Sequence, residues 1–190
     1  ALPSGHLGWI STPLLSYAIR VLGAQGGVNI SASHNPPDDN GVKVYAHHGG
    51  QLEPPHDADL LRAMKTGGEV QRRPVSVIPL PQDLQRRWID QVVGGSRAPG
   101  LSVRYSALHG TGVVNLALEA MGCDVERYGP QSHPDPMFST VPGRVANPER
   151  AEVYAHGLQD CSADLFLCTD PDADRLGVAV NTAEGWQILD

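Results

Sequence analysis

Two stretches of alternating strand and helix patterns, separated by a segment rich in turn-forming residues, constrain the fold of this chain more than any other feature. Residues 94–100 read Gly-Gly-Ser-Arg-Ala-Pro-Gly, a composition that is typical of a linker. On both sides of it, short apolar runs alternate with segments of helical periodicity, which predicts α/β architecture. We therefore expect two successive α/β domains, residues 1–96 and 97–190, each with a mixed sheet flanked by helices.

The first domain is expected to begin with an amphipathic helix. Thr12 is expected to cap this helix, Pro13 to occupy its first turn and Gly23 to end it. A later helix is expected to place Leu60, Leu61 and Met64 on one apolar face that belongs to the core. The other elements expected before the linker are strands over residues 27–32 and 42–45 and helices over residues 55–65 and 82–93.

The second domain repeats the alternation of strands and helices. The turn His109-Gly110-Thr111-Gly112 is expected to open a helix. Its amides could meet a phosphate, but it lacks the lysine of a P-loop, and a tight turn is the alternative interpretation. A Pro-rich loop over residues 130–148 is longer than a compact domain usually carries without a functional reason. The remaining elements expected are strands over residues 101–106, 123–128, 163–168, 176–180 and 186–189 and a helix over residues 148–158.

Charge and composition exclude several classes of protein. The chain has 14 Lys and Arg against 21 Asp and Glu, so its net charge of −7 argues against a nucleic-acid binder. No apolar run approaches the ~18 residues of a membrane span, so no membrane partner is expected. The three cysteines, Cys123, Cys161 and Cys168, lack zinc-site spacing and are expected to be reduced thiols of a cytoplasmic protein.

Three aspartates recur at every second position directly after a predicted buried strand. They are Asp170, Asp172 and Asp174, and Arg175 follows them. In an extended segment alternate side chains point the same way, so we expect the three carboxylates to converge. Mg²⁺ prefers such oxygen ligands, and three facing carboxylates need a cation. The alternatives are an Asp-rich surface turn and a phosphatase that uses Asp170 as its nucleophile.

A second candidate loop contains Ser33, at the point where a strand runs into two prolines and an Asn-Gly pair. A hydroxyl there can accept and donate a phosphoryl group if a metal ion and cations neutralise the charge. His34 and Lys43 are the candidate cations or proton carriers. The alternative is a side-chain-stabilised turn without chemistry. A serine-hydrolase triad is not expected, because adjacent Ser33 and His34 would point to opposite sides.

Together these segments resemble the α-D-phosphohexomutase family, which comprises the phosphoglucomutases and phosphomannomutases. The family carries a T-A-S-H-N-P loop with a phosphoserine, then N-G-x-K, H-G-x-G and D-x-D-x-D-R. Matching segments occur here in the same order, at residues 31–36, 40–43, 109–112 and 170–175. Residues 50–57 and 135–149 are similar to segments of the branch that includes the phosphoglucomutase/phosphopentomutase type. The resemblance covers essentially the whole chain.

The resemblance implies an isomerase that interconverts hexose 1-phosphate and hexose 6-phosphate by intramolecular phosphoryl transfer. Ser33 would be the phosphoserine, and Ser33, Asp170, Asp172 and Asp174 would together hold one Mg²⁺. The serine and the aspartates lie on opposite sides of the linker. Because one metal ion would have to contact both, we expect Ser33 Oγ within a few ångströms of the carboxylates. A sugar 1,6-bisphosphate would be intermediate and activator, and a small phosphosugar would be the partner.

The resemblance also implies roles for three cationic side chains. Lys43 would lie beside the reacting hydroxyl, as proton carrier or as charge stabiliser. His34 would contact the phosphoryl group or orient the substrate, and Arg175 would steady the phosphoserine or the metal loop. Phosphoryl transfer depends mainly on positioning and charge neutralisation, so such a set of groups is chemically sensible.

The chain departs from the family mainly in length. Family members have four domains, whereas this chain resembles most of domain one, without its amino-terminal start, and most of domain two. Within the motifs, Ser31 replaces the usual threonine. We therefore expect this chain alone to have little or no mutase activity. The alternatives are an Mg²⁺-dependent phosphatase that uses Asp170 and a non-catalytic phosphosugar-binding fragment.

Overall fold

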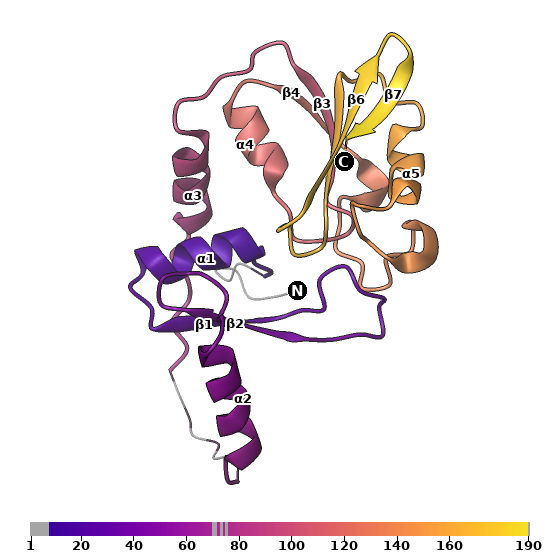
Figure 1. The fold of residues 1–190 in the computed structure, drawn as a ribbon. Coiled ribbons are helices and arrows are strands. Elements are labelled where there is room, and N and C mark those ends of the chain that lie inside the picture. Colours follow the sequence, from indigo (N-terminus) through magenta and orange to yellow (C-terminus); the bar gives the residue numbers. More distant parts are fainter. Residues whose placement is uncertain (1–7, 70–71, 73, 75, 190) are drawn as a thin grey trace.

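The chain forms two α/β units in succession. The computed structural model describes residues 8–69, 72, 74 and 76–189. In Figure 1 the first unit, in indigo and purple, lies below the second, in orange and yellow, and the helix α3 stands beside both. The elements of the first unit are α1 (Thr12–Val21), β1 (Gly26–Ile30), β2 (Val42–Ala46), α2 (His56–Thr66) and α3 (Leu84–Val93).

Helix α1 begins one residue earlier than the sequence suggests. Ser11, not Thr12, is the N-cap, and its side chain accepts the N–H of Leu14. Thr12 is the first helical residue, and its hydroxyl accepts a hydrogen bond of 3.2 Å from the Asn29 side chain. At the other end Leu22 is the C-cap, and Gly23 follows with the left-handed φ of 62° that ends many helices.

The strands β1 and β2 form an antiparallel pair that leads into both ends of the Ser33 loop. The register pairs Asn29 with Lys43 and Ile30 with Val42. Helix α1 packs against both β1 and α3, and the core that it shares with α3 contains Leu14, Tyr17, Ala18 and Leu84. The pair therefore presents the loop between its strands, residues 31–41, at one end of the unit (Figure 1).

Helix α2 buries none of its side chains in the part of the chain that the structure describes. The apolar face expected there is solvent-facing, with Leu61 53% and Met64 71% exposed. The helical spacing of these residues was interpreted correctly as a helix, but the inference that they pack against a core was wrong. Periodicity specifies which side chains share a face and not whether a partner covers that face.

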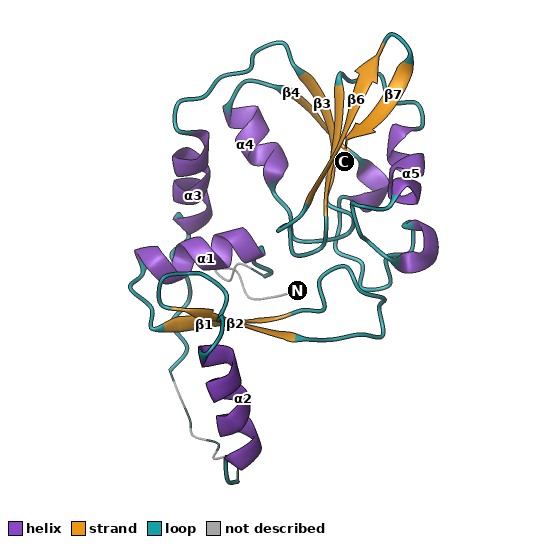
Figure 2. Ribbon diagram, viewed as in Figure 1, coloured by secondary structure: helices purple, strands orange, loops and turns teal. Residues whose placement is uncertain are grey.

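The second unit is a five-stranded mixed sheet with helices on its faces (Figure 2). The strand order is β4-β3-β5-β6-β7, with β3 parallel to β4 and β5 and the remaining pairs antiparallel. Its elements are β3 (Ser102–Ser106), α4 (Val114–Ala120), β4 (Asp124–Arg127), η1 (Gly129–Gln131), η2 (Pro142–Arg144), η3 (Ala151–Val153), α5 (Tyr154–Leu158), β5 (Leu165–Thr169), β6 (Leu176–Thr182) and β7 (Gly185–Leu189).

Strand β5 separates two apolar cores because its side chains alternate between the faces of the sheet. Phe166 and Cys168 belong to the core that includes Tyr154 of α5, whereas Leu167 packs with the core on the α4 side. Burial raises the pKa of the Cys168 thiol to about 12. No described helix is long and apolar enough to cross a membrane.

The helix expected over residues 148–158 is shorter in the structure. Regular helical structure starts only at Ala151, with the short η3 that leads into α5. The preceding residues form a side-chain-stabilised turn, in which Asn147 Oδ1 accepts the N–H of Glu149 and Asn147 O accepts the N–H of Arg150. Asparagine competes with helical backbone bonding in this way, which explains the later start.

Candidate active site

The two loops that carry the candidate chemistry meet in space. Ser33 Oγ donates a hydrogen bond of 2.8 Å to Asp170 Oδ2, although 137 residues separate them in the chain. Ser33 comes from the loop between β1 and β2, and Asp170 follows directly after β5. The expectation that the serine lies within a few ångströms of the carboxylates is confirmed.

The Ser33 loop has a backbone shape that presents the serine hydroxyl. Ser33 has a left-handed φ of 58°, which is unusual for a residue with a side chain. Its N–H donates to Ser31 Oγ at 2.9 Å, and the Ser31 N–H donates to Gly41 O at 2.9 Å. These bonds close the base of the loop and hold the left-handed residue, a kind of backbone outlier that clusters at functional sites.

The aspartate loop is a tight turn and not the extended segment that the sequence suggested. Asp170 Oδ1 accepts the N–H groups of Asp174 and Arg175, each at 3.1 Å, and Ala173 has a left-handed φ of 58°. The reason given for convergence, alternation along an extended chain, was therefore wrong. The turn brings Asp172 and Asp174 to the same Lys43 ammonium, whereas Asp170 points to Ser33, so the expected convergence of all three carboxylates on one point is not found among the described residues.

Asp170 is fully buried, and its surroundings change its acidity. Burial raises the pKa of this carboxyl above its usual value of 3.8, against the opposing effect of the hydrogen bond from Ser33. The negative charges of Asp174 and Asp172 add to the increase. Asp170 is thus the acceptor of the Ser33 hydrogen bond. Its burial at the same time disfavours the ionised form of its own carboxyl group.

Lys43 reaches from β2 into the aspartate loop. Its Nζ lies 2.6 Å from Asp172 Oδ2 and 3.1 Å from Asp174 Oδ2. Burial alone lowers the pKa of Lys43, but the hydrogen bonds and charges of the two aspartates outweigh burial and raise it above 10.5. The aspartate loop therefore holds this side chain as a protonated amine.

The donor set of this site suits Mg²⁺ in its chemistry. Three carboxylates and a hydroxyl, from Ser33, Asp170, Asp172 and Asp174, are the hard oxygen ligands that this ion prefers. In the described residues, however, no three His, Cys, Asp or Glu side chains are placed to hold one metal ion. Asp170 points to the serine, whereas Asp172 and Asp174 point to the Lys43 ammonium, which is itself a cation held by two of these carboxylates.

The other two candidate site residues lie beside this centre. Arg175 directs its guanidinium to Glu149, with Nη1 3.0 Å from Oε1, and so contributes its backbone N–H rather than its charge to Asp170. His34 follows Ser33 in the loop, and its Nδ1 is one of two buried side-chain polar atoms without a hydrogen-bond partner among the described residues. An unpartnered buried nitrogen is costly, so this atom is available for a ligand.

The glycine turn before α4 packs against the aspartate loop and donates hydrogen bonds to it. The N–H and the hydroxyl of Thr111 both donate to Pro171 O at 2.9 Å. A Cβ at Gly110 would lie 2.2 Å from Pro171 Cα, and one at Gly112 would lie 2.1 Å from Tyr105 Oη. The glycines are therefore needed for close packing. The Gly110 N–H also donates to Ala107 O and the His109 N–H to Gln131 O, so three of the four amides considered as phosphate donors already have partners.

Sequence reasoning missed three contributors to the site. Ser31 donates a short hydrogen bond to Asp172 Oδ1 and accepts one from Ser33, and its position two residues before Ser33 is the signal that could have found it. The Thr12 N–H donates to Asp172 O at 2.9 Å, and Glu149 pairs with Arg175. These last two contacts are set by tertiary structure, and no local pattern predicts them.

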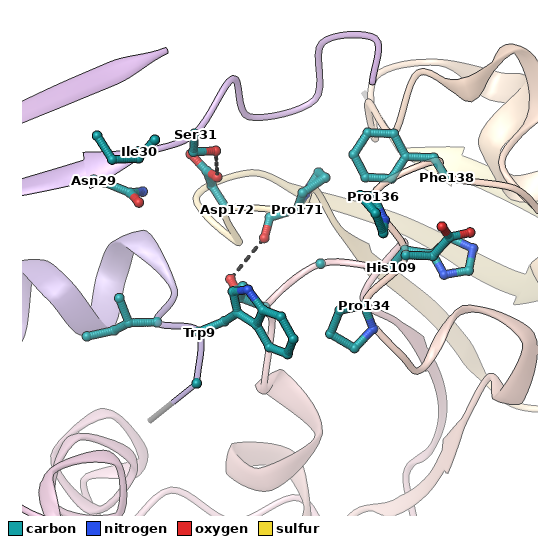
Figure 3. Close-up of a pocket in the computed structure, with 15 residues that line it drawn as sticks. Trp9, Asn29, Ile30, Ser31, His109, Pro134, Pro136, Phe138, Pro171 and Asp172 are labelled. Carbon is teal, nitrogen blue, oxygen red and sulfur yellow. Dashed lines mark hydrogen bonds between the residues drawn. The ribbon is translucent and has the colours of Figure 1, made fainter. Parts of the chain in front are cut away.

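Two cavities adjoin the loops. One of about 250 Å³ is lined by Ser33 and by Pro136 and Phe138 of the second unit. The other, of about 530 Å³, is lined by Ser31 and Asp172 and by the same Pro136 and Phe138 (Figure 3). Ser33 thus borders a cavity that residues of both units line.

Comparison with known proteins matches both units. The family model described as phosphoglucomutase/phosphomannomutase, alpha/beta/alpha domain I matches residues 4–71, and domain II of the same description matches residues 86–185. A Staphylococcus aureus phosphoglucomutase is 34% identical over 192 residues, covering 92% of this chain and 34% of that protein. A probable phosphomannomutase of Haemophilus influenzae is 34% identical over 202 residues, covering 95% of this chain and 40% of that protein.

Solved structures agree with the fold. A crystal structure of a candidate phosphomannomutase from Thermus thermophilus superimposes with a TM-score of 0.72 at 26% identity, over 92% of this chain and 40% of that one. A Burkholderia thailandensis protein of the phosphoglucomutase/phosphomannomutase family has the same fold, with a TM-score of 0.70 at 22% identity, over 94% of this chain and 40% of that one. The expected α/β fold class is confirmed. The chain spans 34% to 40% of the length of the relatives named here.

Proposed function

The chain belongs to the phosphoglucomutase/phosphomannomutase family, and we propose that it carries out phosphoryl transfer on a sugar phosphate through Ser33. The proposed reaction is the interconversion of hexose 1-phosphate and hexose 6-phosphate, which makes the protein an isomerase. Its two named relatives, a phosphoglucomutase and a probable phosphomannomutase, support this class of reaction.

The hydrogen bond from Ser33 Oγ to Asp170 Oδ2 carries this proposal. The acceptor is fixed, because its other oxygen accepts two backbone N–H groups of its own turn. Ser33 is only partly buried and lines the smaller cavity. The serine oxygen is therefore oriented by a carboxylate on one side and reachable from the other, as a phosphoryl acceptor must be.

In the proposed cycle, phosphorylated Ser33 gives its phosphoryl group to the free hydroxyl of a hexose monophosphate. The bond from Ser33 Oγ to phosphorus breaks as the sugar oxygen bonds to phosphorus, and Ser33 regains one proton while the sugar loses one. The resulting 1,6-bisphosphate returns its other phosphoryl group to Ser33 by the reverse exchange. Between the two steps Asp170 Oδ2 accepts the hydrogen bond of the Ser33 hydroxyl and orients Oγ.

Lys43 is assigned the role of charge stabiliser. Its ion pairs with Asp172 and Asp174 raise its pKa, so the amine stays protonated at neutral pH and does not serve as a base. A fixed cation at this place offsets the negative charge of a transferring phosphoryl group. The alternative role as proton carrier is less well supported, because it requires the amine to lose its proton.

Ser33, Asp170, Asp172 and Asp174 are the residues that would hold Mg²⁺. When bound, this ion supplies positive charge that neutralises phosphoryl oxygens. His34 is proposed to contact the phosphoryl group through its unpartnered Nδ1. Arg175 is proposed to steady the metal loop, through its N–H bond to Asp170 and its ion pair with Glu149.

A phosphatase that attacks through Asp170 is the less favoured interpretation of the same loop. Asp170 is fully buried, and both of its oxygens already accept hydrogen bonds. A nucleophile must reach the substrate, whereas this buried carboxylate turns one oxygen to the backbone of its own loop and the other to the Ser33 hydroxyl. A non-catalytic phosphosugar-binding role does not require the Ser33 hydroxyl to be oriented by Asp170, so it leaves this hydrogen bond unexplained.

The chemical stability of the transferred phosphate separates these alternatives. The chain is incubated with glucose 1,6-bisphosphate and Mg²⁺, denatured, and treated with hydroxylamine before intact-mass measurement. Phosphoserine survives this treatment, whereas an aspartyl phosphate is cleaved. Retention of the phosphate supports Ser33 as the acceptor. Loss of the phosphate would assign the chemistry to Asp170, and absence of any phosphate would favour the non-catalytic role.

A further inference from the structure

A loop of the second unit forms a wall beside the reacting serine. This loop, residues 133–140, contributes Pro136 and Phe138 to both of the cavities that adjoin the Ser33 loop. Pro136 is exposed, whereas Phe138 is 9% exposed and also belongs to the core of the second unit. The wall therefore combines an accessible apolar residue, Pro136, with one that is anchored in the core, Phe138.

His109 fixes both ends of the 133–140 loop. Its Nδ1 lies 2.9 Å from His133 O, and its Nε2 lies 2.8 Å from Thr140 Oγ1. A carbonyl oxygen only accepts, so Nδ1 carries the hydrogen, and in the neutral ring Nε2 accepts from the Thr140 hydroxyl. The ring is buried, and the His109 carbonyl also accepts the N–H of Asp135.

The middle of the loop is held by Asp135. Its carboxylate accepts the N–H groups of Met137 and Ser139, each at 2.9 Å, and these bonds lower the pKa of Asp135 to about 2. Between them Phe138 has a left-handed φ of 47°. The wall thus depends on a small set of polar contacts, of which the two ring nitrogens of His109 are the ones that anchor its ends.

We propose that His109 is a positioning residue for phosphoryl transfer, because it fixes the 133–140 loop whose Pro136 and Phe138 place the sugar of the phosphoryl donor beside Ser33. The inference rests on the proposed function, in which Ser33 accepts a phosphoryl group. The C–H faces of a sugar ring pack well on apolar side chains, whereas a small phosphoryl donor has no ring to pack on the wall. A less well-ordered 133–140 loop should therefore lower the rate of Ser33 phosphorylation by a sugar donor more than by a small donor.

Two donors of different size test this proposal in the full chain. Phosphorylation of Ser33 is followed by intact mass with glucose 1,6-bisphosphate as the large donor and acetyl phosphate as the small one. Thr140→Val removes the hydroxyl that bonds His109 Nε2 at nearly unchanged volume. We expect the rate with the bisphosphate to fall about tenfold, mainly through a higher KM, as the loss of one buried hydrogen bond predicts. We expect the acetyl phosphate rate to stay within about twofold.

Three further variants complete the experiment. Thr140→Ser keeps the hydroxyl and should restore the bisphosphate rate, and His133→Ala should match the wild type because only its backbone carbonyl bonds His109. Pro136→Ala alters the wall at an exposed residue, so it keeps the proposal testable if Thr140→Val fails to fold, and it should lower the bisphosphate rate selectively.

Equal losses with both donors in Thr140→Val and Pro136→Ala would mean that the loop has a structural role only, and would overturn the proposal. Unchanged rates with both donors would overturn it as well. If wild-type Ser33 accepts phosphate from neither donor, the proposed function itself fails. That result is distinct, because it is seen before any variant is compared.

Discussion

Asp172 is bound to Lys43 by an ion pair of 2.6 Å that joins the loop after β5 to strand β2. The first unit holds this aspartate at two further points, the Ser31 hydroxyl on Oδ1 and the Thr12 N–H on the backbone carbonyl. Asp172 is only 5% exposed. The contact between the two units therefore includes Ser31, whose hydroxyl oxygen also accepts the Ser33 N–H.

Replacement of Lys43 should destabilise the chain and stop the chemistry. Lys43→Met leaves Asp172 and Asp174 without their cation, and we expect a loss of about 1.5–3 kcal/mol in the free energy of unfolding. Phosphorylation of Ser33 should become undetectable. Urea unfolding and intact mass measure the two effects. Lys65→Met, on the exposed α2, is the control and should change neither.

Asp170→Asn should stabilise the chain while removing function. Burial raises the pKa of this carboxyl above 3.8, so folding favours its protonated form. Below pH 3.8 the carboxyl is protonated in both states and the variant has no advantage. As the pH rises from 3.8 through the folded-state pKa, wild type loses stability and the variant does not. We expect the variant to be more stable by about 0.5–2 kcal/mol at pH 7 without added metal.

Thermal unfolding at a series of pH values, in the presence of a chelator, checks this prediction. The difference between Asp170→Asn and wild type should grow from acid to neutral pH. A difference that shrinks over this range would show that the ionised form is the one favoured by the fold. Asp59→Asn, on the surface of α2, controls for the removal of a negative charge.

Much of the architecture follows from local patterns in the sequence. The strands and most helices were predicted because apolar periodicity and turn residues mark them, and the Ser33 loop was predicted because its prolines forbid regular structure. The meeting of Ser33 with Asp170 was also anticipated, although from shared chemistry rather than from geometry. Alternation along an extended segment did not explain it, because Asp170 folds its own loop into a turn through two N–H groups.

The features that were not predicted depend on contacts between distant parts of the chain. Thr12 was expected to cap α1, yet its hydroxyl bonds Asn29 and its N–H bonds Asp172, so Ser11 takes the capping role. Met64 was expected to be packed, yet nothing described covers it. In each case a local preference is compatible with several tertiary arrangements, and only the fold selects one.

Magnesium should stabilise the chain through the aspartate loop. At a Mg²⁺ concentration of 100 times its dissociation constant, the gain in unfolding free energy should be about 2.7 kcal/mol. Asp172→Ala should abolish this gain, whereas Asp59→Ala, far from the loop on α2, should keep it. Differential scanning calorimetry with and without Mg²⁺ measures the shift. An equal shift in wild type and Asp172→Ala would place the ion elsewhere.

The glycine at position 112 should not tolerate a side chain. A Cβ there would lie 2.1 Å from Tyr105 Oη and 2.4 Å from Thr169 Oγ1, which bond each other at 2.8 Å. We expect Gly112→Ala to cost about 1–3 kcal/mol in unfolding free energy, as overpacking usually does. Gly129→Ala is the control, because nothing lies within 4 Å of its added Cβ. Equal stability of the two variants in urea would contradict the packing described here.

The identity of the phosphorylated residue tests the central claim most directly. The wild-type chain, Ser33→Ala and Ser31→Ala are each incubated with glucose 1,6-bisphosphate and Mg²⁺, digested, and mapped by mass spectrometry. The account predicts one phosphoryl group on Ser33 in the wild type, none in Ser33→Ala, and a slower but detectable modification of Ser33 in Ser31→Ala, because Ser31 only braces the loop. Phosphorylation of Ser33→Ala to the same extent as the wild type, at Asp170 or any other residue, would contradict it.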